Sequence, residues 1–432
     1  MPQIFDSATG ALIDARPTNG TMVASLYVCG ITPYDATHLG HAATYLAYDT
    51  LIRLWLDAGF STDYAQNVTD VDEPLLERAQ RDGVDWRDLA ESQIELFRSD
   101  MQLLGIIPPD HYVGVTETVA EVADAIVLLR QRGFAYAVSN APDAGADIYF
   151  DSATATSPTW KLGQLSHVER SEMLALSAER GGDPERAGKR DPLDPLLWRT
   201  EREGEPAWET ALGRGRPGWH IECSVIAQSY LVSPLTVNGG GSDLLYPHHE
   251  FSAGHTAALT GRPLAAIYSH TGMVGYAGMK MSKSRGNLVF VSRLVAEGTD
   301  PRVIRLALLA EHYRSDWEWT TENLSRAQTR LARWQQWAAP ADAELGHDGH
   351  EGREDRVSDC RDDIEFLAEL RRILANDLDT PAALAAIDDY VAKGTASNTT
   401  ASNTTASNAT VLNATASNAI IIAIDSLLGI KL

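Results

Sequence analysis

Residues 27–41, YVCGITPYDATHLGH, decide the fold of this chain. The apolar, β-prone run 22–28 predicts a strand, and the periodic pattern after this stretch predicts a helix that ends at Gly59. A strand that runs into a helix N-terminus offers free backbone N–H groups and a positive dipole end, which suit a phosphate. His38 and His41 would share one face of the first helical turn and could donate to phosphate oxygens. For this stretch alone, two satisfied surface histidines are the better supported alternative.

The elements on either side extend this unit into a nucleotide-binding domain. Residues 61–68 predict a second strand, and a strand, helix and strand in this order predict a parallel sheet with its site at the strand C-terminal ends. Residues 235–238 and 266–270 predict further strands, whereas the pattern beyond Pro301 is helical. We expect a Rossmann-like catalytic domain at 1–110 and 200–270, an inserted module at 111–199, a lysine-loop region at 271–320 and a C-terminal helical domain at 321–432.

Composition limits the classes of partner. The chain has 432 residues, of which 44% are hydrophobic, so it can bury a large core. Its 59 acidic and 36 basic residues give a net charge of −23, which should repel nucleic acid. Outside the lysine loop, basic residues gather mainly at Arg186, Lys189 and Arg190.

Cysteine usage and hydropathy indicate a cytoplasmic protein. The three cysteines, Cys29, Cys223 and Cys360, form no C-x-x-C motif and do not suggest a disulfide framework. We see no secretory signal and no run long and apolar enough to span a membrane.

The tail from Lys393 repeats Thr-Ala-Ser-Asn, and this low-complexity composition has poor helix propensity.

A second motif changes the interpretation of the two histidines. Residues 278–284, GMKMSKS, place Lys280 and Lys283 in a loop that could clamp a polyphosphate; a solvated basic loop is the alternative. Together with His38-Leu39-Gly40-His41, in this order and at this spacing, the motif resembles the paired signatures of class I aminoacyl-tRNA synthetases. The resemblance implies that these residues grip ATP while an amino acid is adenylated, and that Mg²⁺ accompanies the ATP.

Cys29, Cys223 and His248 could form a zinc site with an open fourth position, or be two buried cysteines and a surface histidine. The motifs around them, YVCG at 27–30, GWHIECS at 218–224 and PHHE at 247–250, are similar to those of cysteinyl-tRNA synthetases. That resemblance implies one Zn²⁺ per chain, which accepts the thiol of the substrate cysteine and so selects sulfur over a serine hydroxyl.

Three departures point to a relative of those synthetases. Phe251 and Ser252 stand where the synthetases continue with Asn-Glu, so their fourth zinc ligand is missing, and Asn238 replaces a histidine. The tail offers no anticodon-reading module. These departures and the run ERGGDP at 179–184 resemble the mycothiol cysteine ligases. The resemblance implies that cysteine is adenylated and then passed to the amine of glucosaminyl-inositol, with release of AMP and diphosphate.

Matching the motifs position by position gives the expected site. His38, His41, Lys280 and Lys283 would stabilise charge on the reacting phosphates, without covalent catalysis. Trp219 would line the amino-acid pocket, unless it is a core residue, and Asp243 suits the ribose hydroxyls. The remaining residues expected around the adenylate are Cys29, Gly30, Ile31, Thr32, Thr44, Asn67, Val68, Thr69, Gly241, Ser242 and Val274.

Two competing functions stay open at this point. A cysteinyl-tRNA synthetase is disfavoured by the net charge, by Ser252 and by the tail. A catalytically inactive zinc-binding scaffold is disfavoured by the intact histidine pair and lysine loop. We therefore expect a monomeric enzyme whose partners are cysteine, ATP and the amino sugar, with no tRNA and no membrane.

Overall fold

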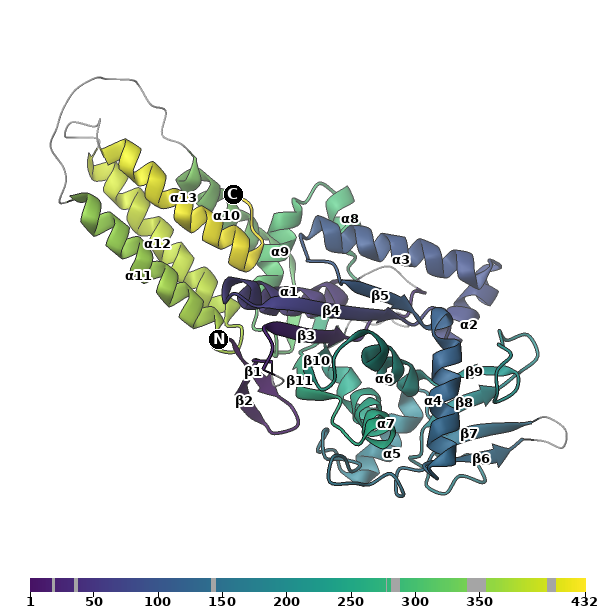
Figure 1. The fold of residues 1–432 in the computed structure, drawn as a ribbon. Helices are drawn as coiled ribbons and strands as arrows, with labels where there is room; N and C mark the ends of the chain where they lie inside the picture. Colours follow the sequence, from purple (N-terminus) through teal and green to yellow (C-terminus); the bar gives the residue numbers. More distant parts are fainter. Residues whose placement is uncertain are drawn as a thin grey trace.

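The computed structural model describes residues 1–432 except 18–19, 35–37, 141–144, 277, 281–287, 340–354 and 402–408. A five-stranded sheet forms its centre, with β3 (Val23–Val28), β4 (Ser61–Val68), β5 (His111–Gly114), β10 (Leu235–Gly241) and β11 (Ala265–Thr271) in the order β11-β10-β3-β4-β5 (Figure 1). Every neighbouring pair is parallel, which confirms the predicted parallel sheet. From β3 the chain moves outward to β4 and later returns to β10 on the other side. The β3–β10 boundary is therefore the switch point where such sheets bind ligands.

Helices cover both faces of this sheet because successive strand residues point to opposite sides. Leu26 and Val28 of β3 belong to a core shared with α1 (Leu39–Asp57), whereas Tyr27 belongs to a second core. That second core includes residues of α6 (Trp219–Tyr230) and α7 (Glu250–Thr260). Strands buried on both faces explain the near-continuous apolar sequence of β3.

A second, antiparallel sheet lies beside the first. It comprises β6 (Ala135–Ser139), β7 (Ala146–Phe150), β8 (Leu196–Thr200) and β9 (Gly215–Pro217), in chain order. β6 and β7 form an antiparallel hairpin in which Ala135 lies opposite Phe150. The short helix η1 (Val115–Glu117) and α4 (Val119–Gln131) lead into this sheet, and α5 (Arg170–Glu179) lies between β7 and β8 in sequence.

The remaining elements bracket the central sheet. The hairpin of β1 (Gln3–Asp6) and β2 (Ala11–Asp14) begins the chain, and α2 (Glu73–Asp82) and α3 (Trp86–Leu103) connect β4 to β5. Two short helices, η2 (Ser242–Leu244) and η3 (Leu245–His249), join β10 to α7. A small sheet contains β12 (Val274–Tyr276), β13 (Met279–Lys280) and β14 (Trp317–Trp319). Between β13 and β14 the chain forms α8 (Val291–Ala296) and α9 (Pro301–Leu309).

The C-terminal helices α10 (Thr321–Ala338), α11 (Asp355–Leu374), α12 (Thr380–Ala401) and α13 (Ala409–Leu428) form a bundle on the opposite side from the antiparallel sheet (Figure 1). The expectation of a poorly helical tail is wrong, because α12 and α13 run through much of it. Tertiary packing overrides propensity here: Ile420, Ile424, Leu427 and Leu428 are fully buried in the core that α1 shares. No helix among the described residues is long and apolar enough to cross a membrane.

How the chain divides into domains stays a proposal. The intervals 1–110 with 200–270, 111–199, 271–320 and 321–432 are those that the sequence predicts.

Candidate functional site

Cys29 and Gly30 follow β3 directly and lie at the switch point of the sheet. The Gly30 amide donates to Oδ1 of Asn67 at 2.8 Å, and the Thr69 amide donates to the carbonyl of Ile31 at 3.0 Å. A Cβ added to Gly30 would lie 1.6 Å from the carbonyl oxygen of Asn67, so only glycine permits this approach. The chain after β3 and the chain after β4 are thereby held together at one edge of the sheet.

Three buried donors meet next to this contact. Sγ of Cys223, on α6, lies 3.9 Å from Sγ of Cys29 and 3.2 Å from Nε2 of His248, which precedes α7. All three ligand atoms lie within 4.8 Å of one another. Two sulfurs and one imidazole nitrogen are a donor set that could hold a metal ion with a position left for substrate. The structure thus brings together three residues that are as much as 219 positions apart, from Cys29 to His248.

Ser252 occupies the sequence position of the missing fourth zinc ligand. Its hydroxyl donates to the carbonyl of His248 at 2.8 Å and lies 3.1 Å from the carbonyl of His220. Ser252 lies on α7 and is 1% exposed, so its hydroxyl links this helix to α6 and to the turn that precedes α7. Ser252 therefore supports the backbone that presents His248 and does not add a donor of its own.

A chain of imidazoles extends from Cys29 to the N-terminal hairpin. Nε2 of His249 lies 3.2 Å from Sγ of Cys29, Nδ1 of His249 lies 2.8 Å from Nε2 of His270, and Nδ1 of His270 lies 2.7 Å from Oγ of Ser7. A metal-bound cysteine is a thiolate and has no proton to donate. With a metal bound to Cys29, the consistent assignment would therefore be that Ser7 donates to His270, His270 donates to His249, and His249 donates to the sulfur.

Burial keeps these imidazoles neutral. It lowers the pKa of His270 to about 3, and it lowers the pKa of His249 well below the usual value, with further contributions from His270 and His248. Burial also lowers the pKa of His220, whose Nδ1 lies 3.1 Å from Nδ1 of His248. His248 therefore has His220, and His249 has His270, as a neutral imidazole partner that can fix its tautomer and orientation.

We expect His249→Leu to weaken metal binding by roughly tenfold to a hundredfold, the range typical for loss of an outer-shell partner. The physical reason is that the Cys29 sulfur loses the N–H donor that stabilises its charge. His249→Gln retains a donor and should recover part of the affinity. Metal competition with a chromogenic chelator measures this, with His111→Gln on the edge strand β5 as the control. Equal affinities in the leucine variant and the native protein would contradict the assignment.

The histidine pair lies at the start of α1. His38 is the N-cap residue, and its Nδ1 accepts from the Gly40 amide at 3.1 Å. The ring centroids of His38 and His41 are 3.9 Å apart. The Leu39 amide donates to the carbonyl of Val289 at 2.9 Å, so the chain just beyond the lysine motif is fastened to the histidine pair. The side chain of Lys280 and the whole of Lys283 lie outside the described residues.

The other expected residues lie around the same edge of the sheet. Trp219 stacks on His248 with ring centroids 4.5 Å apart, and Thr44 Oγ1 lies 2.8 Å from Thr271 Oγ1. Val274 has a 1% exposed side chain in the core, so it could reach an adenine only through its backbone. Ile31 and Val68 are buried, Thr32 is half-buried, and Gly241, Ser242 and Asp243 lie where β10 ends and η2 begins.

Sequence reasoning missed His249, His270 and Ser7. His249 lies inside a quoted motif but carried no spacing signal of its own. Ser7 and His270 are 263 positions apart and meet only through the fold.

Comparisons with known proteins identify the family. Residues 16–329 match the model of the class I (C) tRNA synthetase catalytic domain. The chain is 60% identical to an L-cysteine:1D-myo-inositol 2-amino-2-deoxy-α-D-glucopyranoside ligase from Clavibacter michiganensis, with 91% of this chain and 90% of the relative covered. It is 55% identical to the protein of the same name from Renibacterium salmoninarum, again with 91% and 90% covered.

Solved structures confirm the fold. Mycobacterium tuberculosis methionyl-tRNA synthetase with methionyl-adenylate matches with a TM-score of 0.64 at 16% identity, covering 94% of this chain and 92% of that one. Agrobacterium radiobacter leucyl-tRNA synthetase gives a TM-score of 0.64 at 13% identity, covering 95% and 84%. The predicted α/β class with a C-terminal helical region is therefore right, and the chain belongs to the family of L-cysteine:1D-myo-inositol 2-amino-2-deoxy-α-D-glucopyranoside ligases within the class I synthetases.

Proposed function

We propose that the protein activates L-cysteine with ATP and transfers the cysteinyl group to the amine of glucosaminyl-inositol, in mycothiol biosynthesis. The observation that carries this is the Cys29, Cys223 and His248 cluster at the switch point of a chain 60% identical to a ligase of that name. In the second step the amine nitrogen forms a bond to the cysteinyl carbonyl carbon. The carbon–oxygen bond to phosphate then breaks, AMP leaves, and the nitrogen loses a proton.

The donor set fits Zn²⁺, which would be held by Cys29, Cys223 and His248. When bound, zinc would supply a Lewis-acidic position for the thiolate of the substrate cysteine. The protein's own residues orient the cluster: His249 donates toward Cys29, and Trp219 stacks on His248. These two contacts would thereby orient Cys29 and His248 toward the position that a cysteine thiol takes.

The N-terminus of α1 would act on the nucleotide. The positive end of its dipole favours negative charge, and His38 and His41 lie at this end of the helix. We propose that these groups, with Lys280, Lys283 and Mg²⁺, stabilise the charge that develops on the α-phosphate and the departing diphosphate.

We expect Lys283→Ala and Lys280→Ala each to slow cysteine adenylation about a hundredfold or more, because each removes a charge acting on the transition state. Cysteine affinity should change little, since the metal cluster binds the thiol. ATP–diphosphate exchange at varied cysteine measures both parameters. Lys161→Ala, in the loop before α5, controls for the loss of a lysine, and native exchange rates in both variants would show that the loop is only a solvated surface.

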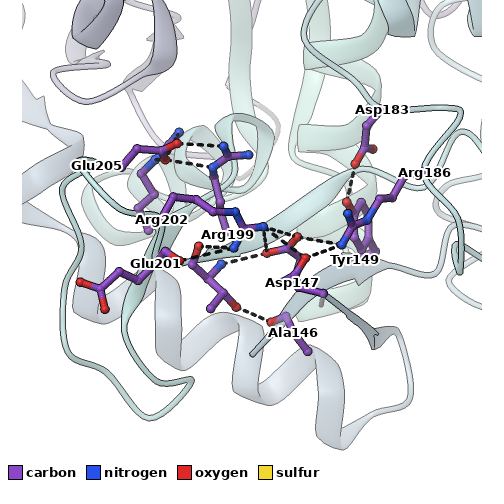
Figure 2. A network of polar contacts seen from close by, with 12 residues as sticks. Ala146, Asp147, Tyr149, Asp183, Arg186, Arg199, Glu201, Arg202 and Glu205 are labelled. Carbon is purple, nitrogen blue, oxygen red and sulfur yellow. Dashed lines mark hydrogen bonds and ion pairs between the residues drawn. The ribbon is translucent and has the colours of Figure 1, made fainter. Parts of the chain in front are cut away.

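The inserted sheet supports a small acceptor over tRNA. The cations that could have formed a basic patch pair with carboxylates: Arg186 with Asp147 at 3.4 Å, Lys189 with Asp183 at 3.0 Å and Arg190 with Asp151 at 2.5 Å. Figure 2 shows the network around Asp147, whose Oδ2 also forms an ion pair with Nη2 of Arg202 at 2.8 Å. Paired guanidinium groups are less available for the many phosphate contacts that tRNA binding requires.

Mass spectrometry of a reaction with cysteine, ATP and glucosaminyl-inositol tests the proposal. We expect the cysteinyl amide of the amino sugar together with AMP and diphosphate. The rate of transfer should depend little on salt, because a small amino sugar binds without polyphosphate contacts. Efficient, salt-sensitive charging of tRNA by the purified protein would instead support a cysteinyl-tRNA synthetase. We further propose that the enzyme works in the cytoplasm as a monomer.

A further inference from the structure

The run ERGGDP at 179–184 is not explained by the metal cluster or by the nucleotide signatures. It ends α5, with Arg180 as the C-cap residue and Gly181 in the left-handed region at a φ of 82°. The Gly182 amide donates to the carbonyl of Ser177 at 2.7 Å, and a Cβ added to Gly182 would lie 2.7 Å from the same oxygen. The two glycines therefore stop the helix and turn the chain immediately after Arg180.

Asp183 fixes the other side of this turn to the inserted sheet. It accepts from the hydroxyl of Tyr149 on β7, as Figure 2 shows, and from Nζ of Lys189 at 3.0 Å. Both donors have buried side chains. Arg180 thus lies in a turn that is anchored to α5 on one side and to the inserted sheet on the other.

The guanidinium group of Arg180 contacts the connection between β10 and α7. Its Nη1 donates to the carbonyl of Asp243 at 2.5 Å and to the carbonyl of Tyr246. Asp243 lies in η2 and Tyr246 in η3, the two short helices of this connection. One charged group therefore joins the inserted segment to the edge of the central sheet, through hydrogen bonds of the stronger, charge-assisted kind.

Neither carbonyl receives the amide bond that a regular α-helix would provide from the residue four positions later. For Asp243 that residue is Pro247, which has no amide hydrogen. For Tyr246 it is Glu250, whose amide donates to two other carbonyls. Arg180 supplies a donor in their place, and without it the backbone of this connection would lose the bonds that fix its conformation.

The connection held by Arg180 carries a group that we expect to meet the nucleotide. Asp243 is expected at the ribose hydroxyls, and its Oδ1 would lie 2.7 Å from a Cβ built on Gly241. The carboxylate is therefore folded back over the C-terminal end of β10, and a shift of its backbone would move it along this edge. His248, farther along the same connection, is held independently, because its carbonyl accepts from the Ser252 hydroxyl at 2.8 Å.

We propose that Arg180 is a positioning residue that orients the Asp243 carboxylate toward the ribose of ATP. Arg180 acts through the carbonyls of Asp243 and Tyr246. The inference rests on the proposed function, in which ATP is a substrate, and it adds a residue of the inserted segment to the residues that determine nucleotide binding.

Calorimetric binding of ATP and of its 2′-deoxy and 3′-deoxy analogues tests this orientation. The native protein should prefer ATP over at least one analogue by roughly tenfold or more, because hydrogen bonds to a charged group are the strong ones. In Arg180→Met this preference should fall to within about threefold, since a displaced carboxylate no longer distinguishes the sugars. Arg180→Lys should restore part of it, because both hydrogen bonds come from the single nitrogen Nη1 and an ammonium group also carries several N–H donors.

Arg170→Met is the matched control. Arg170 lies on α5, and its ion pair with Asp191 at 2.8 Å is partly exposed, so ATP affinity and the preference should stay within about twofold of native. Metal content should stay native in Arg180→Met, because His248 is held by Ser252. Asp243→Ala should lose the preference as well, and adding Arg180→Met should cause little further loss, since two residues that act through one contact are not additive.

Equal affinity of the native protein for ATP and both analogues would overturn the inference, because Asp243 would then not bind the ribose. A native preference in Arg180→Met would also overturn it, as would loss of metal together with ATP binding, which would indicate a general structural role. If Arg180→Met does not fold, Arg180→Gln, which loses the charge, should lower the preference in the same way. Failure of the proposed function looks different: the native protein would form no amide with the amino sugar, while the nucleotide affinities would still test Arg180.

Discussion

Replacing Cys223 with serine should abolish stable metal binding and slow cysteine adenylation by a thousandfold or more. Cys223 Sγ lies within hydrogen-bond distance of His248 and 3.9 Å from Cys29, so it is the donor shared by the other two. A serine hydroxyl is a much poorer ligand than a thiolate for a metal that prefers soft donors. Several kcal/mol of lost transition-state stabilisation correspond to about a thousandfold in rate or more.

The same cluster should control the choice of amino acid. In the native protein we expect kcat/KM for serine to be at least about a thousandfold below that for cysteine, because serine cannot supply the thiolate. In Cys223→Ser the activity that remains should discriminate far less between the two amino acids. Loss of metal binding together with loss of amino-acid discrimination would show that the metal binds the substrate sulfur and does not only stabilise the fold.

Metal analysis by mass spectrometry and ATP–diphosphate exchange with each amino acid measure these effects. Cys360→Ser is the matched control, since Cys360 lies in α11 and should leave metal content and exchange unchanged. About one zinc per chain is expected in the native protein and in this control. Active native enzyme without metal, or comparable adenylation of serine and cysteine, would contradict the zinc assignment.

The central sheet could be predicted because its signals are local. The predicted strand at 61–68 coincides with β4, and the strand–helix unit around residues 27–41 coincides with β3 and α1. Apolar periodicity, Gly59 and the signature motifs all lie within a few tens of residues of the elements they predict. The three metal donors came from the resemblance, because residues as far apart in sequence as Cys29 and His248 carry no spacing signal.

What the sequence could not predict depends on contacts between distant segments. The Ser7–His270–His249 chain reaches Cys29 only because the N-terminal hairpin packs beside β11, where the Tyr268 amide donates to Asp6 at 2.8 Å. The tail was expected to be poorly helical from its composition, but α13 is held by buried isoleucines and leucines that follow the repeats. Propensity is a weak prior when packing decides.

Replacing Arg305 with methionine should destabilise the protein by about 3–5 kcal/mol, the usual cost of removing one partner of a buried ion pair. Arg305 is 1% exposed on α9, and its guanidinium contacts the carboxylate of Asp49 on α1. Its Nε donates to the carbonyl of Leu428 at 2.6 Å, and its Nη1 donates to that of Leu104 at 2.8 Å. One side chain therefore joins α9 to α1, to α13 and to the end of α3.

Loss of Arg305 leaves the Asp49 carboxylate buried with too few favourable contacts to offset its lost hydration. Asp49 would keep the Arg53 contact at 2.8 Å and the Ile107 amide at 2.9 Å, but would lose its fully buried partner. Burial acts to raise the pKa of Asp49, and the charges of Arg305 and Arg53 outweigh it and hold the pKa below its usual range. The pair therefore contributes its stability above the unfolded-state pKa of about 3.9, and loses it as pH falls through the folded-state pKa.

Urea unfolding at pH 7 and again near pH 3.5 measures how much the Arg305–Asp49 pair contributes to the free energy of unfolding; the first transition in the urea curve is the one to compare. Arg302→Met is the matched control: it lies on the same helix and also donates to a C-terminal carbonyl, that of Lys431 at 2.8 Å, but its ion pair with Asp300 is partly exposed. We expect the control to lose at most about 1 kcal/mol. Combining Arg305→Met with Asp49→Leu should recover part of the loss, because no unpaired charge then remains in the core. If Arg305→Met unfolds at the same urea concentration as the control, the buried pair does not hold α13 and α9 against α1.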